Sequence, residues 1–305
     1  MSIIAPWYQL AYIIPHLYTD QDAYQFYRVA PEGMMLVTCG LNLREYSLAA
    51  VEENLPTLRD RFDLMAKKKV DRISLSGVPV ASALGRKKMR EILSDAEQRT
   101  GLPCDTDLEA HIATLQHFGA SKIALATRWP DAVNHMLTQY LAEAGIEVLA
   151  CRSFARTLEA NKYSDAMEDH ELALRLGREV LQAAPGAQAL LMPGGLWFAI
   201  HAVPILEAEF GKPVLLNILS TTWAALHAAG PRMKCGVTST VTLPTESCPT
   251  PCTSLPRSRR PAIINWVSRA SSSSRRRICT GSLSGAALKS PITSVGAAMR
   301  PRSAR

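Results

Sequence analysis

The sequence predicts an α/β fold of two pseudo-symmetric lobes with mostly parallel sheets, a cleft between the lobes and a disordered C-terminal tail. Three observations carry this prediction. Short apolar runs alternate along the chain with segments whose apolar residues recur at helical spacing. The series of runs and segments repeats at an offset of about 110–118 residues. From Pro231 onward this order ends, and the chain becomes rich in Ser, Arg and Pro.

In the first half of the chain, short apolar runs predict strands over 10–14, 34–38, 70–75 and 102–104. Apolar residues at helical spacing predict a helix over 48–68, which Pro56 interrupts, and a second over 86–100, which Gly101 ends. A third helix runs to Phe118, with either Asp105 or Thr106 as its N-cap. The strand over 70–75 leads into a turn at Ser76-Gly77-Val78-Pro79.

In the second half, the same reasoning predicts strands over 122–127, 147–151, 189–192 and 213–216, and helices over 131–144, 164–183, 196–210 and 220–229. The strand over 189–192 is the one around which the chain is organised, because it runs into Pro193-Gly194-Gly195 and then a helix. Free backbone N–H groups at such a turn bind anions. The alternative is a plain turn in which the glycines only let the chain reverse.

The two halves correspond element by element. Residues 70–77 match 188–194, and 101–104 match 211–214. Alternating strands and helices predict two Rossmann-like lobes with right-handed crossovers, whose strand ends line the cleft. We expect residues 1–120 to form the first lobe, completed by about 213–230, residues 121–212 to form the second, and 231–305 to form the tail.

Charge separates the tail from the rest of the chain. The 305 residues contain 34 Lys/Arg and 27 Asp/Glu. From Pro231 onward there are 13 basic residues and one acid, which leaves 21 basic and 26 acidic residues before it. The folded part is therefore mildly acidic. The tail contains a single aromatic residue, Trp266, so aromatic residues do not alternate with its basic ones to stack on bases, and we expect no nucleic-acid partner.

Several function classes are disfavoured by motifs that are missing from the sequence. There is no GxGxxG, P-loop or GxSxG motif, and the histidines lack metal-ligand spacing, so we expect neither a cofactor nor a metal. No apolar run is long enough to span a bilayer. Scattered cysteines without a secretory signal indicate a cytoplasmic protein. The sequence leaves open whether copies of the chain form a homo-oligomer.

The residues then resemble a known superfamily, that of the aspartate/glutamate racemases, and within it the arylmalonate decarboxylases and maleate isomerases. The resemblance covers about residues 8–230 and is strongest from 100 to 230. The segments that carry it are Thr100–Cys104, Gly119–Thr127, Asp131–Asn134, Cys151–Ser153 and Gly194–Leu196.

The resemblance also shows where this sequence departs from the superfamily. Racemases and isomerases of this type have one cysteine at each of the two turns, at positions occupied here by Gly77 and Pro193. The decarboxylases keep only the second cysteine. Hydroxyl residues that follow the first turn are replaced by Val78 and Pro79, and a tyrosine expected in the second lobe is replaced by Trp129.

The function implied is a cofactor-independent decarboxylase that converts a small malonate-like or aromatic dicarboxylate through an enediolate. We expect backbone donors at Gly77, Val78, Gly194 and Gly195, pocket walls at Pro15, Pro79 and Trp129, and a proton donor at His16. Arg128 and Arg152 are candidates to pair with a substrate carboxylate. A maleate isomerase or racemase, and a binding protein without catalytic activity, are the alternatives, because thiols are missing from Gly77 and Pro193.

Overall fold

The fold is an α/β fold built on two four-stranded parallel sheets, as the sequence predicts. The computed structural model describes residues 5–229. The predicted tail over 231–305 lies outside the described residues. The sheets have the strand orders β2-β1-β3-β4 and β6-β5-β7-β8. Because the two orders are equivalent, each lobe repeats the topology of the other, which confirms the pseudo-symmetry.

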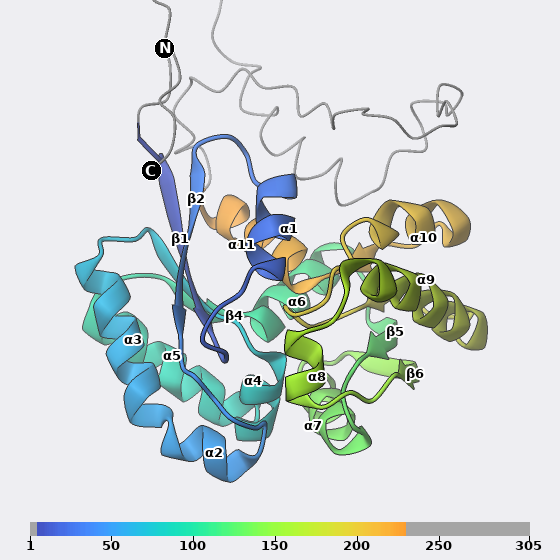
Figure 1. The fold of residues 1–305 in the computed structure, drawn as a ribbon, viewed down its shortest axis with the longest axis horizontal. Helices are drawn as coiled ribbons and strands as arrows, with labels where there is room; N and C mark the ends of the chain where they lie inside the picture. Colours follow the sequence, from blue (N-terminus) through green and yellow to red (C-terminus); the bar gives the residue numbers. More distant parts are fainter. Residues whose placement is uncertain (1–4, 230–305) are drawn as a thin grey trace, which may run out of the picture. The chain divides into compact units, whose positions relative to one another are not determined.

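The first sheet and its helices come from the first part of the chain (Figure 1). In order, they are β1 (Tyr8–Ile14), α1 (Gln21–Val29), β2 (Met34–Gly40), α2 (Leu48–Glu53), α3 (Leu55–Lys67), β3 (Arg72–Leu75), α4 (Val78–Leu84), α5 (Arg86–Thr100), β4 (Cys104–Thr106) and α6 (Asp107–His117). The predicted helix over 48–68 is two helices, since the chain breaks at Asn54 and Pro56 lies in the first turn of α3. Thr106 is the N-cap of α6, where its hydroxyl accepts the N–H of Glu109.

The second sheet and the last helix follow. The elements are β5 (Lys122–Thr127), α7 (Asp131–Ala142), β6 (Glu147–Ser153), α8 (Leu158–Lys162), α9 (Ala166–Ala183), β7 (Ala189–Leu191), α10 (Ala202–Phe210), β8 (Val214–Leu215) and α11 (Asn217–Ala229). β8 pairs with β7, and α11 then packs against α6 and α1 of the first lobe. The chain thus crosses back to the first lobe directly after β8.

The core fills the space around both sheets. β1, β3, β5 and β7 are almost fully buried, because helices cover the central strands and every apolar side chain on them is removed from water. The central strands β1 and β3 end at Ile14 and Leu75, and β7 ends at Leu191. The turns that follow these three strands, together with Arg128 and Trp129 after β5, line the site described next.

Candidate active site

A cavity lies where the turns that follow β1, β3 and β7 meet. Its volume is ≈ 30 Å³, enough for about two water molecules. All nine residues that the sequence predicts for the site line it, namely Pro15, His16, Gly77, Val78, Pro79, Trp129, Pro193, Gly194 and Gly195. The structure therefore brings them together, while their individual roles stay predictions. Polar side chains that the sequence analysis did not select also line it, among them Asp22, Tyr46, Asn161 and Asn217.

The first turn is built on Gly77. Its φ of +119° lies in the region that favours glycine, and a Cβ here would approach Pro15 Cγ to 2.8 Å. The N–H of Gly77 donates to Asp107 Oδ2 at 3.2 Å. This N–H is therefore not available to a ligand, contrary to the expectation from sequence. Val78 begins α4, and among residues 5–229 its N–H has no hydrogen-bond partner.

The second turn has the same construction. The N–H of Gly194 donates to Asn217 Oδ1 at 3.0 Å, so this predicted donor is also engaged within the protein. The N–H of Gly195 has no acceptor within the described part of the chain. Of the four predicted backbone donors, Val78 and Gly195 remain to bind an anion, one from each turn.

The helix predicted from residue 196 begins only at Ala202, which corrects the sequence analysis. Long-range hydrogen bonds hold residues 197–200 out of a helix. Gln25 Oε1 of α1 accepts the N–H groups of Ala199 and Ile200 at 3.0 and 2.9 Å. Trp197 Nε1 donates to the Asp169 carbonyl at 2.9 Å. The second turn is therefore positioned by side chains of both lobes, and α10, the helix that follows it, does not begin at the cavity.

A buried bridge joins the two turns. Asn217 Nδ2 donates to Asp107 Oδ2 at 2.6 Å, and each side chain accepts the glycine N–H of its own turn. Asp107 opens α6 and Asn217 opens α11, so each is the first residue of the helix after the last strand of its sheet. Tyr12 and Thr221 hydroxyls also donate to Asp107 Oδ1, at 3.0 Å each. Burial raises the pKa of Asp107 to about 6 despite these donors.

His111 is hydrogen-bonded to Asn217 of this bridge and to Ser220. Its Nε2 lies 2.9 Å from Asn217 Oδ1 and its Nδ1 lies 2.8 Å from Ser220 Oγ. Since Asn217 Oδ1 is an acceptor, Nε2 carries the proton and Nδ1 accepts from the serine hydroxyl. Burial lowers the pKa of His111 to about 4, so the imidazole is neutral near pH 7.

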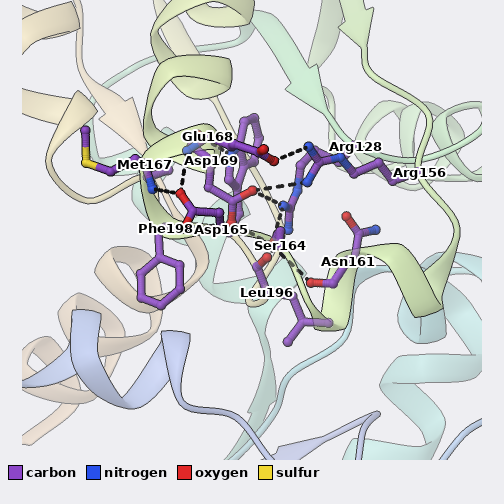
Figure 2. Close-up of polar contacts among 12 residues, drawn as sticks. Arg128, Arg156, Asn161, Ser164, Asp165, Met167, Glu168, Asp169, Leu196 and Phe198 are labelled. Carbon is purple, nitrogen blue, oxygen red and sulfur yellow. Dashed lines mark hydrogen bonds and ion pairs between the residues drawn. The ribbon is translucent and has the colours of Figure 1, made fainter.

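Arg128 lies at the cavity but is engaged by the protein. Its Nη1 is 2.6 Å from Asp169 Oδ1, and its Nη2 donates to the Leu196 carbonyl (Figure 2). Arg156 approaches the same Asp169 oxygen at 3.5 Å. Burial lowers the pKa of Arg128 to about 10, which still leaves it charged at neutral pH. Arg152, the other arginine considered from sequence, is exposed and does not line the cavity.

Three buried side chains at the cavity have a polar atom with no hydrogen-bond partner among the described residues. These atoms are His16 Nδ1, Asp22 Oδ1 and Asn161 Oδ1, on side chains that are 8%, 3% and 3% exposed. Burial and the charge of Lys162 lower the pKa of His16 to about 4. Tyr46 Oη lies 3.2 Å from His16 Nε2. Unsatisfied buried polar groups are costly, so these three atoms are candidates to bind a ligand in the cavity.

Comparison with known proteins agrees with this fold. A family model described as "Arylmalonate decarboxylase" matches residues 21–241. A curated arylmalonate decarboxylase from Bordetella bronchiseptica is 27% identical over 204 residues, which is 67% of this chain and 83% of that protein. A crystal structure of arylmalonate decarboxylase has a TM-score of 0.60 and 26% identity, covering 73% of this chain and 92% of the other.

The same fold is also found in a maleate isomerase. A maleate isomerase from Pseudomonas putida has a TM-score of 0.61 at 18% identity, covering 72% of this chain and 92% of its own. Two equivalent parallel sheets thus define a duplicated α/β fold class that this chain shares with the decarboxylase and the isomerase. Within that class, this chain belongs to the arylmalonate decarboxylase family.

The residues that the sequence analysis missed share one property: they are polar but buried. Asp22 and Gln25 lie on the buried face of α1, together with Gln21. A search for apolar helical spacing does not detect such a face. The usable signal was a helix-length segment between two predicted strands with polar residues at i, i+1 and i+4, namely Gln21, Asp22 and Gln25. Among residues 5–229, no cluster of His, Cys, Asp and Glu is arranged to hold a metal, and no helix is long and apolar enough to cross a membrane.

Proposed function

We propose that this chain is a cofactor-independent decarboxylase that acts on a small malonate-like or aromatic dicarboxylate through an enediolate. Membership of the arylmalonate decarboxylase family supports the class of reaction. The observation that carries the proposal is the meeting of two turns at one cavity, each with one N–H, at Val78 and Gly195, that has no partner among residues 5–229. One N–H from each side suits the two oxygens of a single carboxylate.

The chemistry follows from this arrangement. One substrate carboxylate binds the N–H groups of Val78 and Gly195. The other lies against the apolar walls that Pro79 and Trp129 form, where a charged group is poorly solvated. Loss of that second group as carbon dioxide leaves an enediolate, whose negative charge develops on the oxygens already held by the N–H groups. Donors fixed before the reaction stabilise that charge without reorganisation.

His16 is the residue that the sequence predicts as proton donor. Its imidazole is neutral near pH 7, since burial lowers its pKa to about 4. A general acid works best when its pKa lies near the working pH. We therefore assign His16 to binding a substrate oxygen through Nδ1, the ring nitrogen without a partner, while Tyr46 holds Nε2.

An isomerase or racemase is the alternative reaction. It needs a nucleophile or a pair of bases at the turns, and Gly77 and Pro193 supply neither. The described cysteines, Cys39, Cys104 and Cys151, do not line the cavity. Burial also raises the pKa of Cys104 to about 12, which keeps its thiol protonated. Decarboxylation needs only one proton donor, so the site suits it better.

The test is proton NMR of the full chain in deuterated buffer with phenylmalonate, maleate and aspartate in separate samples. We expect phenylmalonate to lose carbon dioxide and to gain deuterium at the new C–H. Conversion of maleate to fumarate, or exchange at the aspartate α-carbon, would replace the proposal by an isomerase or a racemase. The matched comparison is Pro193→Cys: activity in this variant alone would identify the natural protein as a binding protein that retains the anion pocket.

A further inference from the structure

Asp22 occupies the space beside the second turn. It lies in the first turn of α1, lines the cavity and is 3% exposed. A Cβ built on Gly195 would lie 2.2 Å from Asp22 Oδ2 and 2.9 Å from Oδ1. The carboxyl group is thus packed against the backbone of Gly195, the residue whose free N–H we assign to the substrate carboxylate.

The hydrogen bonds of Asp22 distinguish its two oxygens. Oδ2 accepts from the Thr19 hydroxyl at 3.1 Å. Oδ1 has no partner among residues 5–229, although it is buried. A carboxylic acid whose carbonyl oxygen is Oδ2 and whose O–H is on Oδ1 fits this arrangement, because it presents the hydrogen on the oxygen that has no other contact.

The charges around Asp22 favour the protonated form. The charged groups that act on it are Asp107 of α6 and Asp20 of its own turn, and both are negative. Arg128 lines the same cavity, but Asp169 and the Leu196 carbonyl hold its guanidinium. His16, Tyr12 and Tyr46 are neutral near pH 7. Burial, followed by Asp107, raises the pKa of Asp22 to about 8, against a smaller lowering by Thr19.

No other side chain at the second turn can supply a proton. Pro193 has neither an acidic group nor an N–H, and Gly194 and Gly195 have no side chains. Across the cavity, Val78 and Pro79 are apolar. We propose that Asp22 is the proton donor of this site and delivers the hydrogen on Oδ1 to the carbon from which carbon dioxide has left. This inference rests on the function proposed above.

The step balances as follows. The bond between the α-carbon and the departing carboxylate breaks, and its electron pair forms the enediolate. The Asp22 O–H bond then breaks as the new C–H bond forms on the face of the enediolate next to the second turn. Asp22 is left as a carboxylate and takes one proton from solvent. Each turnover consumes one proton and releases one molecule of carbon dioxide, with no oxidant or reductant.

The experiment compares Asp22→Asn with Asp20→Asn in the full-length protein. Asn keeps the shape of Asp22 but cannot donate an acidic proton. Asp20 is the exposed N-cap of α1, and Asn is an equally good N-cap, so this variant is the control. Decarboxylation of phenylmalonate is followed between pH 5 and 9. The infrared band of a protonated carboxyl group is recorded at pH 7.

We expect Asp22→Asn to lower kcat by about 100-fold or more, as for loss of a general acid. The wild-type rate should fall tenfold per pH unit above about pH 8, and the residual rate of the variant should lose this fall. A protonated-carboxyl band at pH 7 should disappear in Asp22→Asn and stay in Asp20→Asn. With a 2-aryl-2-methylmalonate, the residual product of Asp22→Asn should lose enantiomeric excess, because its proton comes from solvent.

Two results would overturn the assignment of Asp22: no carboxyl band that depends on Asp22 at pH 7, or an Asp22→Asn variant that decarboxylates at the wild-type rate. Failure of the proposed function looks different. In that case the band would be present and would depend on Asp22, but the wild-type protein would release no carbon dioxide from either malonate.

Discussion

Two adjacent glycines are required at the second turn for different physical reasons. Gly194 has a φ of +130°, which a residue with a side chain rarely adopts. Gly195 has an ordinary backbone conformation, but the space that its side chain would occupy is filled by Asp22. A glycine in a turn is usually explained by backbone freedom, whereas at 195 the constraint is the volume of a neighbouring carboxyl group.

This predicts the effect of Gly195→Ala. The added methyl group must displace Asp22, so we expect a loss of about 1–3 kcal/mol in the free energy of unfolding, as for overpacking. In an Asp22→Ala background the same change should cost much less, because the clash is gone. Urea denaturation of the four proteins measures this coupling. The control is Gly186→Ala, whose Cβ would meet only Leu149 Cδ1 at 3.6 Å. Equal costs in both backgrounds would contradict the packing described.

At the scale of elements, α6 and α11 fix the two turns through their first residues. Asp107 and Asn217 accept the N–H groups of Gly77 and Gly194 and are hydrogen-bonded to each other. The positions of the two remaining free N–H groups, at Val78 and Gly195, therefore depend on one buried pair of side chains. The side chains of Asp107 and Asn217 therefore set the geometry of the anion site, and one of its two donors, the N–H of Val78, belongs to the first residue of α4.

Asn217→Ala tests this dependence. It removes the acceptor for Gly194 N–H and His111 Nε2 and the donor to Asp107, from a side chain that is 2% exposed. Since each unsatisfied buried group costs about 1–3 kcal/mol, we expect a loss of at least ~2 kcal/mol. Ser220→Ala is the matched control, because it removes one hydrogen bond, to His111 Nδ1, and should cost about 1 kcal/mol. Chemical denaturation gives both values. An Asn217→Ala loss no larger than that of Ser220→Ala would contradict the bridge.

At the scale of the molecule, the buried groups around the cavity predict how stability depends on pH. The folded-state pKa values of Asp22 and Asp107 are raised, to about 8 and about 6. Their contribution to the free energy of unfolding is therefore present at low pH and is lost as the pH rises. Those of His16 and His111 are lowered to about 4, so their contribution is lost as the pH falls below 6.5. Between about pH 4 and 6, rising pH therefore lowers the contribution of the two aspartates to the free energy of unfolding and raises that of the two histidines.

Above pH 6.5 only Asp22 among these four groups still binds a proton in the folded chain that the unfolded chain has released. We therefore expect the free energy of unfolding to fall by up to ~1.4 kcal/mol per pH unit from about 6.5 to 8. Asp22→Asn should remove this slope, and Asp20→Asn should keep it. Denaturant titrations at several pH values measure it. A slope that persists in Asp22→Asn would show that other groups cause it.

The sequence predicted the sheets well because their strands are continuous apolar runs. Each predicted strand overlaps an observed one, and the repeat predicted the two equivalent sheets. The prediction from the sequence failed where long-range contacts determine the local structure. α1 was missed because three of its five buried residues, Gln21, Asp22 and Gln25, are polar. The start of α10 was misplaced because Gln25 and Asp169 hold residues 197–200 in an irregular path.

The site, too, could be predicted only as far as local sequence patterns determine it. Strand ends and glycine turns located the cavity, because the carboxyl ends of parallel strands meet at one edge of a sheet. The partners of Gly77 N–H and Gly194 N–H were not predictable, since Asp107 and Asn217 follow later strands and face inward only in the folded chain. Local patterns thus indicate where a site lies, whereas its free donors and acids depend on tertiary contacts.

The pairing of Asp107 with Asn217 also bears on how a duplicated protein diverges. Two copies of the first half related by a two-fold axis would bring two aspartates together at this point, where like charges in a buried site repel. Two copies of the second half would join two amides and provide no charge. The observed chain has one of each, a donor facing an acceptor. Its halves have become complementary at this position, so neither can replace the other, although their strands still follow the same order.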